Sequence, residues 1–217
     1  MRIKDYAKKF YFATGNKKLK PTNDIKYLIW SIPAIVTCPN ATDDCKNKCY
    51  ARKAERQYKN ALRSRRKNWD FSKTEEFVED VTNFIHLKAK NWKNAKRIVV
   101  RIHESGDFYS KEYFLKWVEV ANRCKDIDNV IFMAYTKSLP FIVGVEVPSN
   151  LFIRSSIWAD TSEEMLTLTE ELGLPIYTAC ESEEWNGLKK KNQCDCKCCS
   201  TCNKCWSNIE KLYCEIH

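Results

Sequence analysis

Short runs of β-branched and aromatic residues alternate along this chain with segments whose apolar residues recur at helical spacing. The short runs are bounded by polar residues, glycine or proline, which is typical of buried strands. The longer segments gather their apolar residues on one side, as helices do when they pack on a sheet. The pattern predicts strands at Ile32–Thr37, Ile98–Ile102, Val130–Tyr135, Leu151–Ser155 and Pro175–Ala179, and helices at Glu75–Lys90, Lys111–Arg123 and Ser162–Leu172.

Polar and thiol side chains follow these predicted strands at the points where the strands end. Alternating strands and helices indicate an α/β fold with a parallel sheet, and such sheets carry their functional groups at the carboxyl ends of the strands. We therefore expect one functional edge. In chain order, the residues predicted to lie there are Cys38; His103, Glu104, Ser105, Gly106 and Asp107; Thr136 and Lys137; Ser155, Ser156, Trp158 and Asp160; and Cys180.

Composition narrows the class of protein. Hydrophobic residues make up 44% of the 217 residues, which is ample for a packed core and excludes a disordered or fibrous chain. The longest apolar run, Tyr27 to Val36, is interrupted and too short to span a membrane, and the first twelve residues lack a secretory signal. We expect a soluble, cytoplasmic protein with no membrane partner, organised as a main unit over residues 1–180 and a cysteine-rich tail over 181–217.

Twelve cysteines in such a chain point to metal ligation, because the cytosol keeps thiols reduced. A secreted, disulfide-bonded protein that has lost its signal is the alternative. One set is a C-x6-C-x3-C run, and the other is a dense terminal group. Cys124 stands alone among apolar helical positions and is predicted to be an inert core thiol. The predicted metal ligands are Cys38, Cys45 and Cys49 in the first set and Cys199, Cys202, Cys205 and Cys180 in the second, with Cys194, Cys196 and Cys198 as alternates to Cys180.

Two metals suit these thiols. Thiolates are the usual protein ligands of 4Fe-4S clusters, and three of them on one loop leave one iron open to another ligand. The C-x2-C-x2-C spacing of the tail is closer to that of bacterial ferredoxins than to the separated pairs of a zinc ribbon. One or two 4Fe-4S clusters are therefore predicted, with structural zinc as the alternative.

Charge is concentrated in one segment. The chain has a formal net charge of +9, and the stretch from Lys46 to Lys67 alone carries ten lysines and arginines against one acid, Glu55. Tyr50, Tyr58 and Trp69 lie in or beside this predicted basic helix. The pattern is typical of a phosphate-binding surface and makes nucleic acid a candidate partner, while a merely solvated helix face is the alternative.

Several of these motifs together resemble the bacteriophage gene product 88 family. They are Ile32-Pro33-Ala34 through Cys38-Pro39, Cys45, Cys49-Tyr50-Ala51, Val100 through Phe108, Ala134 through Ser138, and Cys199-x2-Cys202-x2-Cys205-Trp206. The resemblance runs from about Gly15 to Trp206. It implies an incomplete parallel β/α barrel, similar to the radical S-adenosylmethionine fold, with three cysteines after the first strand. The spacing here departs from the C-x3-C-x2-C motif of those enzymes.

Under this interpretation the strand ends form a ligand pocket. His103, Glu104 and Asp107 are the candidate catalytic groups, because an imidazole and carboxylates at a strand end can transfer protons or hold a ligand. A capping or turn role for the same residues is the alternative. Thr136, Lys137 and Ser155 would bind the polar groups of a cofactor such as S-adenosylmethionine. The leading hypothesis is an iron-sulfur protein of phage type and unknown substrate, with radical-enzyme chemistry as its catalytic form. The alternative is a zinc-stabilised nucleic-acid-binding or host-interaction protein without catalysis.

Overall fold

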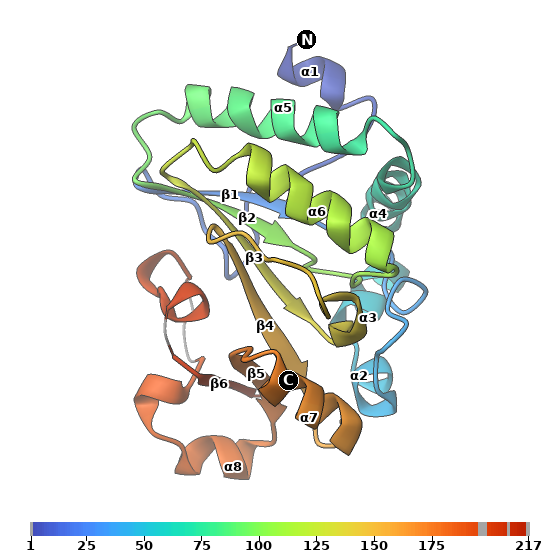
Figure 1. The fold of residues 1–217 in the computed structure, drawn as a ribbon, viewed down its shortest axis with the longest axis vertical. Helices are drawn as coiled ribbons and strands as arrows, with labels where there is room; N and C mark the ends of the chain where they lie inside the picture. Colours follow the sequence, from blue (N-terminus) through green and yellow to red (C-terminus); the bar gives the residue numbers. More distant parts are fainter. Residues whose placement is uncertain (1, 195–198, 208, 216–217) are drawn as a thin grey trace.

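A computed structural model of the chain describes residues 2–194, 199–207 and 209–215. Within these residues, six strands form one all-parallel sheet in the order in which they occur along the chain. The sheet curls into a half-barrel with helices between successive strands, as Figure 1 shows. The predicted incomplete β/α barrel is therefore confirmed. The strands are β1 (Ile25–Trp30), β2 (Arg97–Ile102), β3 (Val130–Thr136), β4 (Leu151–Ile157), β5 (Ile176–Cys180) and β6 (Lys211–Glu215).

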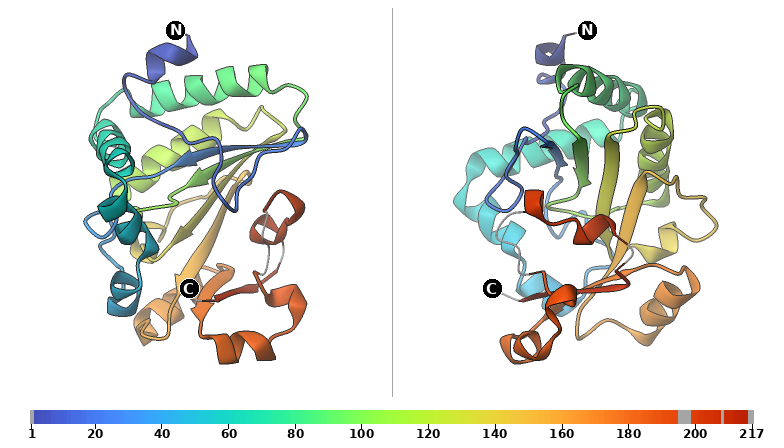
Figure 2. Two further views of the ribbon diagram at one scale, coloured as in Figure 1. Left: turned by 180° about the vertical axis from the view of Figure 1, so that it is seen from behind. Right: turned by 90° about the vertical axis from the view of Figure 1, so that its left-hand side faces the viewer.

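The helices cover the outer face of the half-barrel and its carboxyl edge. α5 and α6 pack side by side on the outer face, while α2, α3 and α4 follow one another down one side of the molecule (Figures 1 and 2). Of the helices described, none is both long enough and apolar enough to cross a membrane. Their bounds are α1 (Ile3–Tyr6), α2 (Asp43–Asn47), α3 (Tyr50–Gln57), α4 (Lys59–Ser72), α5 (Phe77–Asn91), α6 (Lys111–Arg123), α7 (Glu163–Glu171) and α8 (Ser182–Gly187), with short 3-10 turns η1 (Leu139–Phe141), η2 (Lys190–Asn192), η3 (Cys199–Thr201) and η4 (Lys204–Trp206).

The alternation of side chains along the strands divides the core in two. Trp30 of β1 points to the helix-covered face, where its ring lies 5.5 Å from that of Phe77 and 5.7 Å from that of Trp117. The inner face of the half-barrel carries a smaller apolar cluster, which includes Tyr27 and Met133 and is covered by Trp206 of the tail. Cys124 lies fully buried in the outer core, as predicted for an inert thiol.

The prediction of the first strand was wrong. The strand is Ile25–Trp30, whereas residues 32–37 form a turn after it. Pro33 has no backbone N–H to give to a ladder, and Ile35 has a φ of 67°, which no strand contains. The apolar run that spans both segments hides this boundary. The other four predicted strands and the helices predicted at 75–90, 111–123 and 162–172 agree with the structure to within two residues at each end. The single basic helix expected between Lys46 and Lys67 is instead divided among α2, α3 and α4.

The tail contributes to the sheet. Its strand β6 was not predicted, yet it pairs in parallel with β5 along the edge of the half-barrel, with Ile176 opposite Lys211 and Cys180 opposite Glu215. Residues 199–207, which precede β6, lie against the inner face of the sheet, on the side away from α5 and α6 (Figure 2). The tail therefore fills the concave side of the barrel.

Candidate metal centre at the carboxyl edge of the sheet

The loop that follows β1 carries Cys38 to the carboxyl edge and is fixed there by the turn after β2. The N–H of Ile32 donates to the carbonyl of Ser105 (3.0 Å), and the N–H of Asp107 donates to the carbonyl of Thr37 (3.2 Å). Between these two bonds lies Gly106, with a φ of 84°. A Cβ at Gly106 would lie 2.3 Å from Ile32 Cγ1 and 2.6 Å from Thr37 Oγ1, so only glycine permits this close approach.

The thiols of Cys38, Cys45 and Cys49, which we call the rim thiols, all lie at this edge. Burial raises the pKa of Cys38 to about 12, with further contributions from the Asp107 carboxylate and from the other two thiols. Burial also raises the pKa of Cys45, while the nearby ammonium of Lys137 opposes that rise. The rim thiols are thus close enough to affect one another electrostatically. Without a bound cation, Cys38 and Cys45 remain protonated near neutral pH.

The two short helices of this region place the second and third rim thiols. Thr42 caps α2, where its hydroxyl accepts a hydrogen bond from the N–H of Cys45 (3.3 Å). Cys49 is the residue that precedes α3 and takes the N-cap position. Among the residues that the structure describes, no three His, Cys, Asp or Glu side chains are already arranged as a metal site. Metal binding at the rim thiols would therefore require them to draw together.

Asp107 organises the ends of β2 and β3. Its Oδ1 accepts hydrogen bonds from the hydroxyl of Thr136 (2.6 Å) and the N–H of Phe108 (2.7 Å), and its Oδ2 accepts from the N–H of Lys137 (2.9 Å). Burial raises the pKa of Asp107 despite these bonds. With its oxygens occupied in this way, Asp107 and Thr136 hold the strand ends in place and set the position of Lys137.

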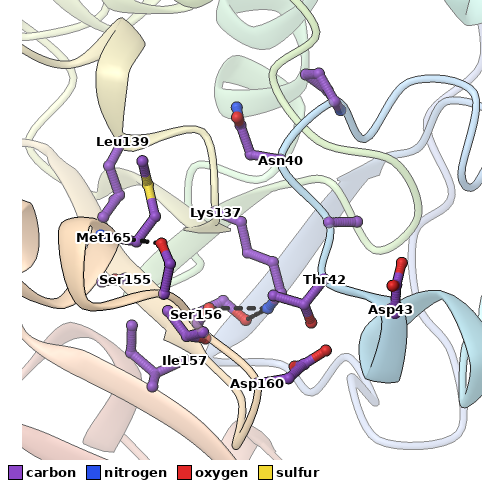
Figure 3. Close-up of a pocket in the computed structure, with 14 residues that line it drawn as sticks. Asn40, Thr42, Asp43, Lys137, Leu139, Ser155, Ser156, Ile157, Asp160 and Met165 are labelled. Atoms are coloured by element: carbon purple, nitrogen blue, oxygen red, sulfur yellow. Dashed lines mark hydrogen bonds between the residues drawn. The ribbon is translucent and has the colours of Figure 1, made fainter.

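A pocket of about 470 Å³ opens beside the rim thiols (Figure 3). The Lys137 side chain reaches into it and donates from Nζ to the carbonyl and the hydroxyl of Ser156, both at 2.8 Å. Burial lowers the pKa of Lys137, and the neighbouring Cys45, Asp107, Asp160 and Cys38 oppose that change. The polar residues around the pocket are Asn40, Thr42, Asp43, Lys137, Ser155, Ser156, Asp160, Thr161 and Ser162.

Of the residues predicted for this site, Lys137 and Ser155 line the pocket. The hydroxyl of Ser155 shares a hydrogen bond with that of Thr169 on α7 (2.8 Å), so α7 fixes its position. The sequence placed Asp160 at this edge but assigned it no catalytic or binding role. Its Oδ2 accepts from the N–H of Asp44 at the start of α2 (2.8 Å) and thereby ties the pocket wall to the thiol-bearing loop. A carboxylate and an ammonium therefore face the same space.

His103 lies in the core beneath the edge, outside the pocket lining. Its ring packs 4.7 Å from that of Phe108, and its Nε2 shares a hydrogen bond with the Tyr113 hydroxyl (3.0 Å). Burial, aided by Arg101, lowers the pKa of His103 to about 3, so the imidazole is neutral at physiological pH. Its backbone adopts a left-handed φ of 63°. This setting suits the capping and turn alternative better than proton transfer.

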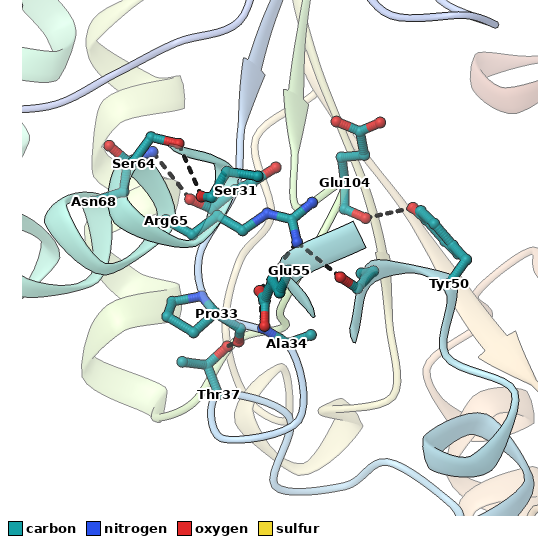
Figure 4. Close-up of polar contacts among 12 residues, drawn as sticks. Ser31, Pro33, Ala34, Thr37, Tyr50, Glu55, Ser64, Arg65, Asn68 and Glu104 are labelled. Carbon is teal, nitrogen blue, oxygen red and sulfur yellow. Dashed lines mark hydrogen bonds and ion pairs between the residues drawn. The ribbon is translucent and has the colours of Figure 1, made fainter. Parts of the chain in front are cut away.

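Glu104 is not part of the pocket lining. Its Oε1 accepts from the side-chain amide of Asn16 (2.7 Å), and its backbone carbonyl accepts from the Tyr50 hydroxyl, as Figure 4 shows. The Tyr50 bond joins the turn after β2 to the first residue of α3, and the Asn16 bond joins the same turn to the segment before β1. Glu104 therefore contributes to the architecture of the edge on its concave side.

A buried ion pair anchors the basic helices to the loop after β1 (Figure 4). Arg65 on α4 lies 3.0 Å from the Glu55 carboxylate on α3, and both side chains are largely buried. The same carboxylate accepts from the N–H of Ala34 (2.8 Å), and Arg65 also donates to the carbonyl of Ala51 (3.0 Å). The sequence counted Arg65 as part of a charged surface, whereas the structure gives it a structural role.

The tail thiols form a second group on the inner face of the half-barrel. Cys199 and Cys205 pack against the apolar cluster there, and the Tyr135 hydroxyl donates to Cys205 Sγ at 2.7 Å. Burial raises the pKa of Cys199 to about 11, with Cys205 and Cys202 adding to the rise. Cys194 joins this group, because a hydrogen bond to the Cys214 thiol, burial and the neighbouring Cys205 all raise its pKa.

Cys180, the predicted fourth ligand of the tail, lies instead beside β6. Its Sγ donates to the carbonyl of Cys214 at 3.7 Å, and burial together with the carboxylate of Glu184 raises its pKa to about 11. The alternates Cys196 and Cys198 lie outside the described residues.

A single arginine holds the tail against the sheet. Arg154 on β4 is 1% exposed and donates to the carbonyls of Cys205 and Lys204 (both 2.8 Å), Ile209 (2.7 Å) and Ser207 (3.1 Å). Such charge-assisted bonds are stronger than neutral ones and fix the backbone of the tail. Nothing in the sequence pattern marked Arg154, because a lone arginine within a strand has no motif around it.

Comparisons with known proteins identify the family and two relatives of this chain. Residues 7–208 match the family model described as Gene product 88. A 105-residue stretch is 31% identical to the Gene 88 protein of Mycobacterium phage D29 and 32% identical to the Gene 88 protein of Mycobacterium phage L5. Each match covers 46% of this chain and 42% or 43% of the relative, so the aligned stretch spans less than half of either phage protein. No solved structure matches the chain significantly.

Proposed function

The chain belongs to the Gene product 88 family, and from that premise we propose that it is an iron-sulfur protein whose rim thiols hold a 4Fe-4S cluster beside a ligand pocket. Because both relatives are phage proteins, the proposed setting is the cytoplasm of a host cell. The observation that carries the proposal is that three thiols of the segment after β1, Cys38, Cys45 and Cys49, lie at the carboxyl edge of a parallel half-barrel, beside a polar pocket.

The three rim thiols are ligands of the kind that a 4Fe-4S cluster takes. Thiolates are the standard protein ligands of iron-sulfur clusters, and a bound cation removes the protons that the buried thiols otherwise keep. Three protein ligands leave one iron open, and the cluster, when bound, would supply electron transfer and a site for a chelating ligand. Cys38 and Cys45, whose pKa values burial raises, would bind the cluster as thiolates.

The pocket favours a ligand that carries one negative and one positive group. Lys137 can bind a carboxylate, and Asp160 can bind an ammonium group across the same space. An amino-acid moiety has this pair of groups, and S-adenosylmethionine is the candidate that also chelates iron. In this proposal Asp107 and Thr136 position Lys137, while Ser155 offers a hydroxyl from the facing wall.

Metal content after anaerobic reconstitution tests the proposal. The wild type should be brown and hold iron with an equal amount of acid-labile sulfide. Replacing Cys38, Cys45 and Cys49 with alanine should remove the share of iron that belongs to the rim. The matched control is Cys124→Ala, which removes a buried thiol from the core and should leave the iron content unchanged. A colourless protein with stoichiometric zinc would overturn the proposal in favour of a zinc-stabilised protein without catalysis.

Ligand binding tests the pocket separately. S-adenosylmethionine added to the reduced protein should change its paramagnetic resonance spectrum. Lys137→Met should weaken that response at least tenfold while the iron content is kept, because it removes the only ammonium among the residues described in the lining. Lys125→Met, at an exposed position after α6, is the control. An unchanged spectrum at saturating ligand would contradict the pocket assignment and leave an electron-transfer cluster.

For the tail, we infer a second, closed site with Cys199, Cys202, Cys205 and Cys194 as ligands. Cys194 is a better fourth ligand than Cys180, because its thiol, which bonds with Cys214, also lies near Cys205, whereas the groups that act on the Cys180 thiol include none of Cys199, Cys202 and Cys205. Cys194→Ser should therefore lower the iron content of the tail, and Cys180→Ser should not. The reverse result would restore the ligand set that the sequence predicted.

A further inference from the structure

The structure divides the ten basic side chains between Lys46 and Lys67 into two classes. Four of them are already engaged within the fold: Lys46 with Asp43 (3.3 Å), Lys48 with Glu181 (2.7 Å), Arg65 with Glu55 (3.0 Å) and Lys67 with the carbonyl of Ala7 (2.6 Å). In the part of the chain that the structure describes, the other six side chains are exposed and make no hydrogen bond or ion pair. These are Arg52, Lys53, Arg56, Lys59, Arg63 and Arg66.

Three of these free cations share one face of α4. Lys59, Arg63 and Arg66 are spaced four and three residues apart, which places them on the same side of a helix. They line a shallow hollow of about 540 Å³ together with Leu62, Lys67 and a single acid, Asp70. On a surface of mixed charge, carboxylates would neutralise such a row of cations, whereas Asp70 is the one acid among the residues that line this hollow. The surface therefore offers several positive groups to an external anion with repeated charges.

An exposed aromatic ring lies within this row of charges. Tyr58 separates α3 from α4, with an extended backbone at φ −121° and ψ 97°, and is 57% exposed. Lys59 follows it in the chain, and Arg56 lies two residues before it. An aromatic ring among free cations is the combination by which proteins bind single strands, because the ring stacks on a base while the cations contact the phosphates.

The helices that carry this surface are rigidly held. The Arg65–Glu55 pair joins α4 to α3, and Asn68 bonds with the backbone of Tyr11 and Ser31. The free cations are therefore presented on a fixed scaffold. A fixed array loses less conformational freedom when it binds than a flexible basic tail would.

We propose that the exposed surface of α3 and α4, built from Arg52, Lys53, Arg56, Tyr58, Lys59, Arg63 and Arg66, binds single-stranded nucleic acid. The phosphates would lie along the cations, and Tyr58 would stack on one base. This binding does not require a metal at either thiol group, so it stands or falls independently of the iron-sulfur proposal.

Fluorescence anisotropy with labelled 20-nucleotide oligothymidylate and oligouridylate tests this inference on the full chain. Contact with four to six phosphates predicts that the logarithm of the binding constant falls with the logarithm of salt concentration at a slope of about −3 to −4. The variant Lys59→Glu, Arg63→Glu, Arg66→Glu should bind at least tenfold more weakly and show a shallower slope. Tyr58→Leu should weaken binding about fivefold to twentyfold without changing the slope.

A charge-matched control separates a specific surface from general attraction. Lys90, Lys93 and Lys125 are exposed and lie away from α3 and α4, and changing all three to glutamate alters the net charge by the same amount. This control should bind within about threefold of the wild type, with circular dichroism reporting that both triple variants fold. Equal loss in the two triple variants, no binding at 50 mM salt, or tighter binding to duplex DNA or to anionic vesicles than to single strands would overturn the inference.

Discussion

The two thiol groups of this molecule share one chemistry and differ in their surroundings. The rim thiols lie on a loop and two short helices at the carboxyl edge, beside a polar pocket. The tail thiols lie on the inner face of the sheet, packed against apolar side chains and covered by Trp206. Cysteine spacing alone cannot distinguish an open site from a closed one, whereas the space beside the thiols can.

The charges beside the two groups differ as well. At the rim, the carboxylate of Asp107 raises the pKa of Cys38. At the tail, the Tyr135 hydroxyl, Arg101 and Arg154 all act to lower the pKa of Cys205 against the effect of burial. The net effect is still a raised pKa at Cys205, Cys199 and Cys194, so the tail thiols, like the rim thiols, need a bound cation to become thiolates. The difference in surroundings, a polar pocket at the rim and apolar packing at the tail, favours a ligand-binding role for the rim and a structural or electron-transfer role for the tail.

The largest effect should come from breaking the attachment of the tail. Arg154→Met removes a buried guanidinium and its hydrogen bonds to four tail carbonyls, which should lower the free energy of unfolding by about 4 kcal/mol. Urea denaturation measures this change. Arg123→Met, which removes an exposed pair with Glu119 on α6, should cost no more than about 0.5 kcal/mol.

Iron analysis of the same variant sharpens the comparison. Arg154→Met should lose iron from the tail site and retain that of the rim thiols. Equal loss from both sites would mean that the two regions do not behave separately.

A smaller loss of stability is expected from adding a side chain at Gly106, where the backbone packs closely against Ile32 and Thr37. Gly106→Ala should lower the free energy of unfolding by about 3 kcal/mol, because the new methyl group collides with Ile32 and Thr37 and the backbone is left-handed. Gly144→Ala is the matched control, since its φ is 72° but no atom lies within 4 Å of the added Cβ. It should cost about 1 kcal/mol. Thermal unfolding of the two variants checks the difference, and equal losses would contradict the packing argument.

The pH dependence of stability should reveal the buried imidazole under the rim. The pKa of His103 falls from an ordinary 6.5 to about 3 on folding, so the unfolded chain binds the proton more readily. The contribution of neutral His103 is complete above pH 6.5 and is lost as the pH falls towards 3. Between pH 6.5 and 4.5 this loss amounts to about 2 kcal/mol.

His103→Asn separates this contribution from other titrating groups. Asparagine tolerates the left-handed backbone and does not titrate, so the variant should be less stable at neutral pH but lose about 2 kcal/mol less on acidification. Urea midpoints measured across this pH range provide the check. An identical pH slope in the wild type and the variant would show that His103 accepts a proton in the folded state as easily as in the unfolded one.

The sequence predicted the strand ends well because buried parallel strands leave a strong local pattern. Polar residues directly after Ile102 and Tyr135 could therefore be assigned to one edge, and Lys137 does line the pocket there. The first strand was misplaced because the apolar run continues past Trp30 into a turn. Arg154, Asp160 and the Arg65–Glu55 pair act through partners distant in the chain, which a single sequence does not reveal.

Mössbauer spectroscopy of protein reconstituted with ⁵⁷Fe, before and after addition of S-adenosylmethionine, tests most directly whether the rim site is open and the tail site closed. An open cluster has one iron without a protein ligand, and that iron alone should change its environment when the ligand binds beside Lys137. The account predicts that the spectrum of one iron subsite shifts while all others, including those of the tail, stay unchanged. A spectrum in which no subsite responds to saturating ligand, or in which the tail irons respond instead, would contradict it.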